Sequence, residues 1–145
     1  MLDDLYQEVI LDHTRRPRNF HQMPDATRQV EGYNPLCGDK LKLFVKLDGE
    51  TIQDISFVGA GCAISTSSAS LMTEAVKGKS RQEAVQMMER FHDLLTTEKP
   101  AAANIGKLTV FSGVREFPAR VKCATLAWHT LKSALTDVGE VVSTE

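Results

Sequence analysis

The sequence of 145 residues lacks a long apolar run, an excess of charge of one sign and an even number of cysteines. No apolar run approaches the roughly 18 residues of a membrane helix, and residues 1–16 lack the basic flank and apolar core of a secretory leader. Seventeen basic and nineteen acidic residues give a net charge of −2, which excludes a global field that attracts nucleic acid or an anionic membrane. Three cysteines cannot form a complete set of disulfides, so we expect reduced thiols in the cytoplasm.

The size and composition predict a single domain over residues 1–145. The chain is 42% hydrophobic and 25% charged, close to the average for globular proteins. At about 150 residues a domain buries roughly 70% of its unfolded surface, so it needs neither disulfides nor a metal merely to fold. The sequence has no repeat, low-complexity tract or interdomain linker, and we expect the tail after about residue 137 to be loosely ordered.

Period-two alternation predicts a small antiparallel sheet. Apolar and mostly basic residues alternate over 40–47, which is typical of a half-buried strand, and Asp48-Gly49 supplies a hairpin turn. A returning strand follows over 52–58, where a change of phase after Ile52 indicates a β-bulge. We expect a third strand near 28–33.

Helical spacing accounts for most of the remaining chain. The first helix ends before Pro17, and serines at 65–70 offer N-cap oxygens for a second. Residues 80–83 fit a capping box for a third helix, and Pro118 opens a fourth. Because the strands come early and the helices late, we predict an α+β fold, with a small antiparallel three-stranded sheet covered on one face by helices.

Each cysteine falls at the boundary of a predicted element. Cys37 lies in a tight loop before the alternating strand, Cys62 follows the returning strand, and Cys123 lies in the first turns of the last helix. A hairpin brings its two outer ends together, so we expect Cys37 and Cys62 to be neighbours. The spacing alone does not show whether Cys123 joins them.

These positions suit a metal site with Asp39 as a candidate fourth ligand. Glycines beside Cys37 and Cys62 permit close backbone approach, and helix N-termini lower the pKa of nearby thiols. Three thiolates and a carboxylate suit tetrahedral Zn²⁺, and an oxygen ligand is more typical of a site that exchanges ligands than of a closed structural one. Such a complex carries net negative charge, which favours release of one thiolate. That charge also attracts nearby basic residues, namely Lys40, Arg120 and Lys122.

Other interpretations of these residues stay open. A free cysteine is most often a small buried hydrophobe, and the chain has no paired Cys-x-x-Cys. The glycines at 59–61 lack the third glycine of a dinucleotide-binding loop, so we dismiss that interpretation. His129 lies six residues after Cys123 on another helical face, so we expect a surface or packing residue rather than a ligand.

Three ordered motifs resemble the IscU/SufU family of iron–sulfur cluster assembly proteins. They are NPLCGD at 34–39, GAGCAIS at 59–65 and FPARVKCATLAW at 117–128. The resemblance spans nearly the whole chain and implies the SufE/IscU-like fold. Scaffolds of the IscU type carry a histidine just before the third cysteine and a double proline upstream, where this chain has Lys122 and FPAR. The longer separation of Cys62 and Cys123 also resembles the SufU branch of zinc-dependent sulfurtransferases.

This resemblance implies a persulfide acceptor and relay rather than a stand-alone enzyme. Zinc would be held by four residues, namely Cys37, Asp39, Cys62 and Cys123. A PLP-dependent cysteine desulfurase would dock and offer a histidine to the zinc, releasing Cys37 as the thiolate that takes the terminal sulfur. Arg120 would steady the anionic sulfur, and the persulfide would pass to a downstream iron–sulfur scaffold.

The competing interpretation is an IscU-type scaffold that assembles and transfers a [2Fe–2S] cluster. Thiolates suit iron as well as zinc, so either occupant could use the same ligands. Lys122 in place of a histidine disfavours the scaffold. A purely structural zinc domain is a third interpretation.

Overall fold

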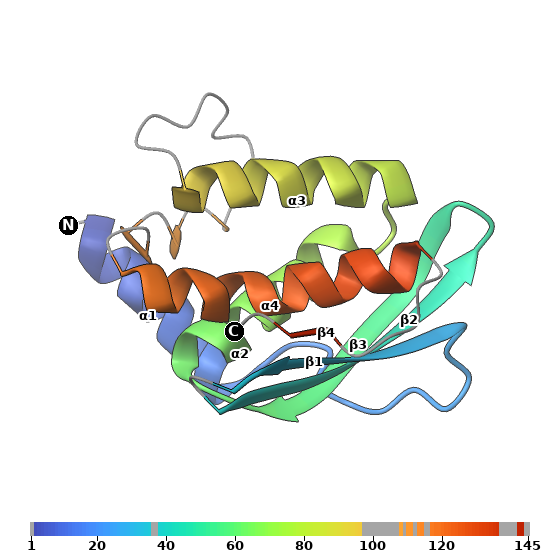
Figure 1. The fold of residues 1–145 in the computed structure, drawn as a ribbon, viewed down its shortest axis with the longest axis horizontal. Helices are drawn as coiled ribbons and strands as arrows, with labels where there is room; N and C mark the ends of the chain where they lie inside the picture. Colours follow the sequence, from blue (N-terminus) through green and yellow to red (C-terminus); the bar gives the residue numbers. More distant parts are fainter. Residues whose placement is uncertain are drawn as a thin grey trace.

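The computed structural model describes residues 2–35, 38–96, 108, 110, 111, 113, 114, 117–136, 142 and 143. Its elements, in chain order, are α1 (Leu2–Arg15), β1 (Arg28–Asn34), β2 (Asp39–Asp48), β3 (Thr51–Ala60), α2 (Ala63–Val76), α3 (Arg81–Thr96), α4 (Pro118–Leu135) and β4 (Val142–Ser143). Among these helices, none combines the length and hydropathy that a membrane span requires. The early strands and late helices confirm the predicted α+β class (Figure 1).

The sheet has the order β3-β2-β1-β4. The pairs β1–β2 and β2–β3 are antiparallel, as predicted, and the two residues of β4 add a short parallel pairing to β1. The β2–β3 register shifts between Lys46, which faces Asp54, and Leu47, which faces Ile52. Gln53 is therefore the extra residue, which confirms a bulge directly after Ile52.

Helices cover one face of this sheet in two layers. In Figure 1, α4 lies between the sheet and α3, and α2 and α4 make the main helix contacts with the strands. Eleven of the 18 residues of α4 are buried, so this helix is surrounded on most sides rather than amphipathic. Trp128 of α4 stacks on Phe91 of α3, with 5.1 Å between the ring centroids, and the edge of Phe111 completes the cluster. This packing fixes the position of α4.

Two of the three predicted helix starts are confirmed. The Ser80 N–H donates to Glu83 Oε1 and the Glu83 N–H donates to Ser80 Oγ, both at 3.1 Å, which is the reciprocal capping box. Pro118 occupies the start of α4. The prediction for α2 was wrong, because its N-cap is Cys62 and the serines lie inside the helix. Most of these small side chains are buried, which lets α2 pack closely against α1 and α4.

The N-terminal segment is tied to α2 and to the free edge of β3. His13 Nδ1 lies 2.6 Å from Ser70 Oγ, which also accepts the Arg18 N–H at 2.8 Å. Further along, the Phe57 N–H of β3 donates to the Asn19 carbonyl at 2.9 Å. This contact covers an edge strand that would otherwise leave its polar backbone groups open to pairing.

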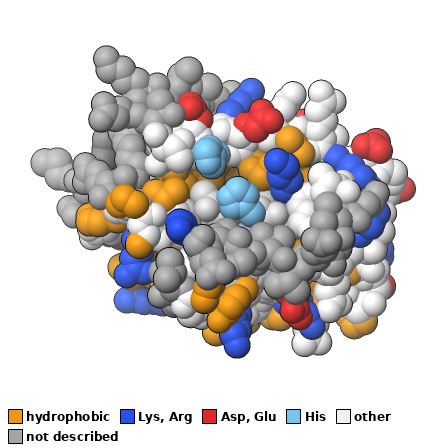
Figure 2. All heavy atoms as spheres, viewed as in Figure 1, with side chains coloured by type: hydrophobic (Ala, Val, Ile, Leu, Met, Phe, Trp, Pro, Cys, Tyr) orange, Lys and Arg blue, Asp and Glu red, His pale blue; other side chains and the backbone are white. Residues whose placement is uncertain are grey.

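Charged side chains of both signs lie on the face of the molecule that Figure 2 shows. On the face in Figure 2, the described basic and acidic residues are interspersed rather than gathered into one patch. This distribution agrees with the net charge of −2.

Gly32 of β1 allows the sheet to approach α4, so we predict that Gly32→Ala destabilises the fold. A Cβ at this position would collide with Thr130 Oγ1 and lie 3.2 Å from Leu126 Cδ1, both on α4. We expect a loss of about 1–3 kcal/mol in the free energy of unfolding, measured by urea denaturation. Adding Thr130→Ala should restore part of the loss. Equal stability of Gly32→Ala and wild type would contradict the close β1–α4 packing.

Candidate metal centre

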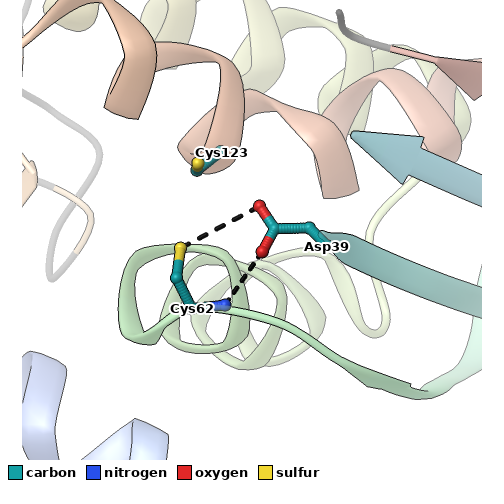
Figure 3. Close-up of side chains that lie close together, drawn as sticks. All are labelled: Asp39, Cys62 and Cys123. Carbon is teal, nitrogen blue, oxygen red and sulfur yellow. Dashed lines mark hydrogen bonds between the residues drawn. The ribbon is translucent and has the colours of Figure 1, made fainter. Parts of the chain in front are cut away.

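Three elements bring a carboxylate and two thiols together. Asp39 begins β2, Cys62 caps α2, and Cys123 lies in the second turn of α4; one ligand atom from each lies within 4.8 Å of the others (Figure 3). Cys123 therefore joins the site, which the spacing alone could not show. Cys37 lies outside the described residues, so its expected place beside Cys62 stays a prediction.

Asp39 is held by the backbone at the start of α2. Its side chain is fully buried, and its Oδ1 accepts the Cys62 N–H at 2.8 Å. The second oxygen, Oδ2, lies 3.9 Å from the Cys62 sulfur, whose thiol donates to it. One oxygen is thus fixed by the backbone, and the other faces the sulfur ligands.

Cys62 owes its position to the helix that it caps. Its backbone is extended, with φ −72° and ψ 169°, and its carbonyl accepts the Thr66 N–H at 3.0 Å. Its sulfur accepts the Ser65 N–H at 3.4 Å and is half-buried. The sulfur therefore lies at the positive end of the α2 dipole, next to this N–H.

Cys123 is the more enclosed of the two thiols. It is fully buried, and its thiol donates to the Ala119 carbonyl one turn earlier at 3.6 Å. The side-chain amide of Asn34 donates to the same sulfur at 3.8 Å. The next residue, Ala124, accepts the Ser68 hydroxyl of α2 at 2.6 Å, which fastens the two ligand-bearing helices together.

This group fits a divalent cation. A buried carboxylate needs a compensating charge, yet within the described chain Asp39 has as hydrogen-bond partners only one backbone N–H and one weak thiol donor. Ligand atoms of a tetrahedral zinc site lie about 3.6–3.8 Å apart, so atoms that all lie within 4.8 Å of one another need to close by at most about 1 Å. Thiolates and a carboxylate are donors that such a cation accepts. The group of described residues includes no histidine.

The three predicted basic residues differ in where they lie relative to the group. Arg120 and Lys122 lie exposed in the first turns of α4, just before Cys123. The predicted attraction of Lys40 to the site was wrong. Because successive strand residues face opposite sides of the sheet, Asp39 is buried towards the helices while Lys40 lies over the exposed Tyr33 ring, 5.9 Å from its centroid.

One residue at the site, Asn34, was given no role by the sequence analysis. Asn34 pairs with Asp39 in the β1–β2 register, and both are fully buried. The sequence did contain a signal for Asn34, because a hairpin closed by the loop after residue 34 places Asn34 and Asp39 opposite each other. Gly61, by contrast, confirms that a glycine beside Cys62 permits close approach, since a Cβ there would lie 2.6 Å from Asp39 Oδ1.

Comparisons with known proteins match nearly the whole chain. The family model of the NifU-like N terminal domain matches residues 5–124. An iron–sulfur cluster assembly scaffold protein IscU from Streptococcus pyogenes is 44% identical, over 92% of this chain and 84% of the relative. A zinc-dependent sulfurtransferase SufU from Bacillus subtilis is 43% identical, over 92% and 91%.

The fold is similar to that of solved structures. One is a putative iron–sulfur cluster assembly scaffold protein for the SUF system from Fervidobacterium islandicum, with a TM-score of 0.84 and 37% identity. The similarity covers 88% of this chain and 94% of that one. The α+β architecture is therefore shared with a protein whose sequence is also related.

We predict that Gly61→Ala weakens metal binding while the fold persists. The added Cβ would displace the Asp39 carboxylate from the Cys62 N–H, because this short buried side chain has little room to move. Affinity for Zn²⁺, measured by competition with a chromophoric chelator, should fall about 10-fold or more.

A double-variant cycle tests whether displacement of the Asp39 carboxylate causes this loss of zinc affinity. In an Asp39→Ala background, adding Gly61→Ala should change the affinity little, because the group it would displace is gone. If Gly61→Ala lowers the affinity equally in both backgrounds, the carboxylate is not what Gly61 accommodates.

Proposed function

The chain belongs to the NifU-like N-terminal domain family, among IscU/SufU-type iron–sulfur cluster assembly proteins, and we propose that it is a zinc-dependent acceptor of persulfide sulfur. The observation that carries this proposal is the buried group of Asp39, Cys62 and Cys123, which pairs two thiols with a carboxylate. The relatives' names alone do not choose a branch, because a scaffold and a sulfurtransferase are nearly equally similar.

Two features favour sulfur transfer over cluster assembly. The residue before Cys123 is Lys122, an exposed cation that binds no metal at neutral pH, whereas the resemblance assigns a histidine ligand to scaffolds. A carboxylate ligand such as Asp39 favours a site that exchanges ligands. Both features support a site that gives up one thiolate.

We assign zinc to Asp39, Cys62 and Cys123, with Cys37 as the fourth ligand. When bound, zinc keeps thiols deprotonated at neutral pH, and its d¹⁰ shell undergoes no redox change. The chain's own N–H groups contact two of these sulfurs: the Ser65 N–H at the start of α2 donates to Cys62 Sγ, and the Asn34 amide donates to Cys123 Sγ.

The sulfur-transfer step is a thiol exchange on Cys37. Its thiolate attacks the terminal sulfur of a persulfide carried by a cysteine desulfurase, forming a new S–S bond as the donor's S–S bond breaks. The desulfurase cysteine leaves as a thiolate, so no external oxidant or reductant is needed. Arg120, in the first turn of α4 and one turn before Cys123, supplies positive charge for the anionic sulfur.

The partners in this proposal are two proteins. A PLP-dependent cysteine desulfurase supplies the sulfur, and a downstream iron–sulfur scaffold receives it. The PLP belongs to the desulfurase. We include a cytoplasmic location in the proposal, because all three thiols must stay reduced to work.

The second candidate function is a scaffold that assembles a [2Fe–2S] cluster on the same residues. The 44% identical relative named as a scaffold favours it, and cysteine thiolates are the ligands that hold iron–sulfur clusters. The two functions predict different occupants and different products, so experiment separates them.

We predict that Cys37→Ser abolishes sulfur uptake, because a hydroxyl cannot take the place of the accepting thiolate. The protein is incubated with a cysteine desulfurase and ³⁵S-cysteine, and the protein-bound persulfide is located by mass spectrometry after alkylation. Wild type should carry one additional sulfur on Cys37, and Cys37→Ser should carry none while keeping its circular dichroism spectrum.

Cys123→Ser provides the matched control, since it also removes one thiol from the site. It should bind zinc more weakly yet still carry labelled sulfur on Cys37. Labelled sulfur on Cys62 or Cys123 of the Cys37→Ser protein would show that Cys37 is not the acceptor.

A further inference from the structure

Asn34 is a buried amide in contact with a ligand sulfur. It is the last residue of β1, its side chain is fully buried, and its Nδ2 donates to the Sγ of Cys123 at 3.8 Å. The two residues lie 89 positions apart in the sequence, so only the tertiary fold brings them together.

The packing of β1 against α4 makes this contact possible. Asn34 faces the same side of the sheet as Gly32, two residues earlier, where the absence of a side chain lets β1 approach Thr130 and Leu126 of α4. In the β1–β2 register Asn34 also stands opposite Asp39. The end of this hairpin therefore presents an anionic ligand and a hydrogen-bond donor side by side.

An amide N–H has a defined chemical effect on a thiolate. A hydrogen bond to the charged form is stronger than one to a neutral thiol, so it stabilises the thiolate. It also withdraws electron density from the sulfur, which makes the sulfur a weaker nucleophile. Groups that hydrogen-bond to metal ligands orient them and tune metal affinity.

The two described thiols differ in these respects. Cys123 is fully buried beneath the Asn34 amide, whereas Cys62 is half-buried and receives a backbone N–H at the N-cap of α2. Cys123 is thus less accessible than Cys62 to a bulky persulfide donor. The surroundings of Cys123 are those of a ligand that stays in place.

We propose that Asn34 is a positioning residue that keeps Cys123 on the metal as the permanent thiolate while another thiol exchanges. This inference rests on the proposed metal centre. In this proposal Asn34 acts on the site through the Cys123 sulfur.

Asn34→Asp tests the role of the amide, with Co²⁺ as the probe ion. A carboxylate has nearly the same shape but repels the thiolate, so the thiolate-to-Co²⁺ charge-transfer band should move to lower energy. In the zinc-loaded protein, alkylation of Cys123 by iodoacetamide, followed by mass spectrometry, should accelerate about 10-fold or more. Asn34→Leu, which lacks charge and donor, should change both readouts in the same direction.

Asn19→Asp is the matched control, because its amide makes a similar contact away from the metal. Asn19 Nδ2 donates to Thr73 Oγ1 at 3.0 Å, so this variant loses an amide hydrogen bond of the same kind. It should leave the charge-transfer energy and the alkylation rate of Cys123 unchanged. Equal changes in both variants would mean that lost stability, not contact with Cys123, is responsible.

The contact between Asn34 and Cys123 can also be tested in the wild-type protein, so that this test does not depend on whether a variant folds. In ¹¹³Cd-loaded protein, a scalar coupling between ¹¹³Cd and a side-chain amide proton of Asn34, through the Cys123 sulfur, is expected. No such coupling should reach the Asn19 amide. The absence of this coupling from the Asn34 amide overturns this inference. Asn34 variants that keep the wild-type charge-transfer energy and the wild-type alkylation rate of Cys123 also overturn it. A wild-type protein that gives no thiolate–Co²⁺ band instead overturns the proposed metal centre itself.

Discussion

The hydrogen bond from the Cys62 N–H to Asp39 Oδ1 joins the strand and the helix that carry these two ligand residues. It links the first residue of β2 to the N-cap of α2 at 2.8 Å, and it orients a buried carboxylate towards two sulfurs. Gly61 leaves room for that carboxylate, since any side chain there would occupy the same space. Without this bond the carboxylate would have one weak described donor, the Cys62 thiol, and little reason to remain buried.

The remainder of the fold brings Cys123 to this point. The stacked Phe91 and Trp128 rings fix α4 in the core, and Ser68 fastens the N-terminal part of α4 to α2. At the sheet, Gly32 lets β1 approach the same helix. Helix and sheet packing thus brings the three described ligand residues together.

Local patterns in the sequence account for most of the fold but for only part of the site. Alternation over 40–47 and the capping box at 80–83 act within a few residues, so both were predictable. The Cys62 cap was missed because serine oxygens are the usual N-cap groups, whereas here a sulfur accepts the Ser65 N–H. The Asn34 contact depends on where α4 lies against β1, and no local pattern contains that information.

The metal content of freshly purified protein tests the central claim most directly. The account predicts a colourless protein with one zinc per chain, bound through thiolates and Asp39. A brown protein that contains iron and acid-labile sulfide would contradict it and support cluster assembly at the same residues.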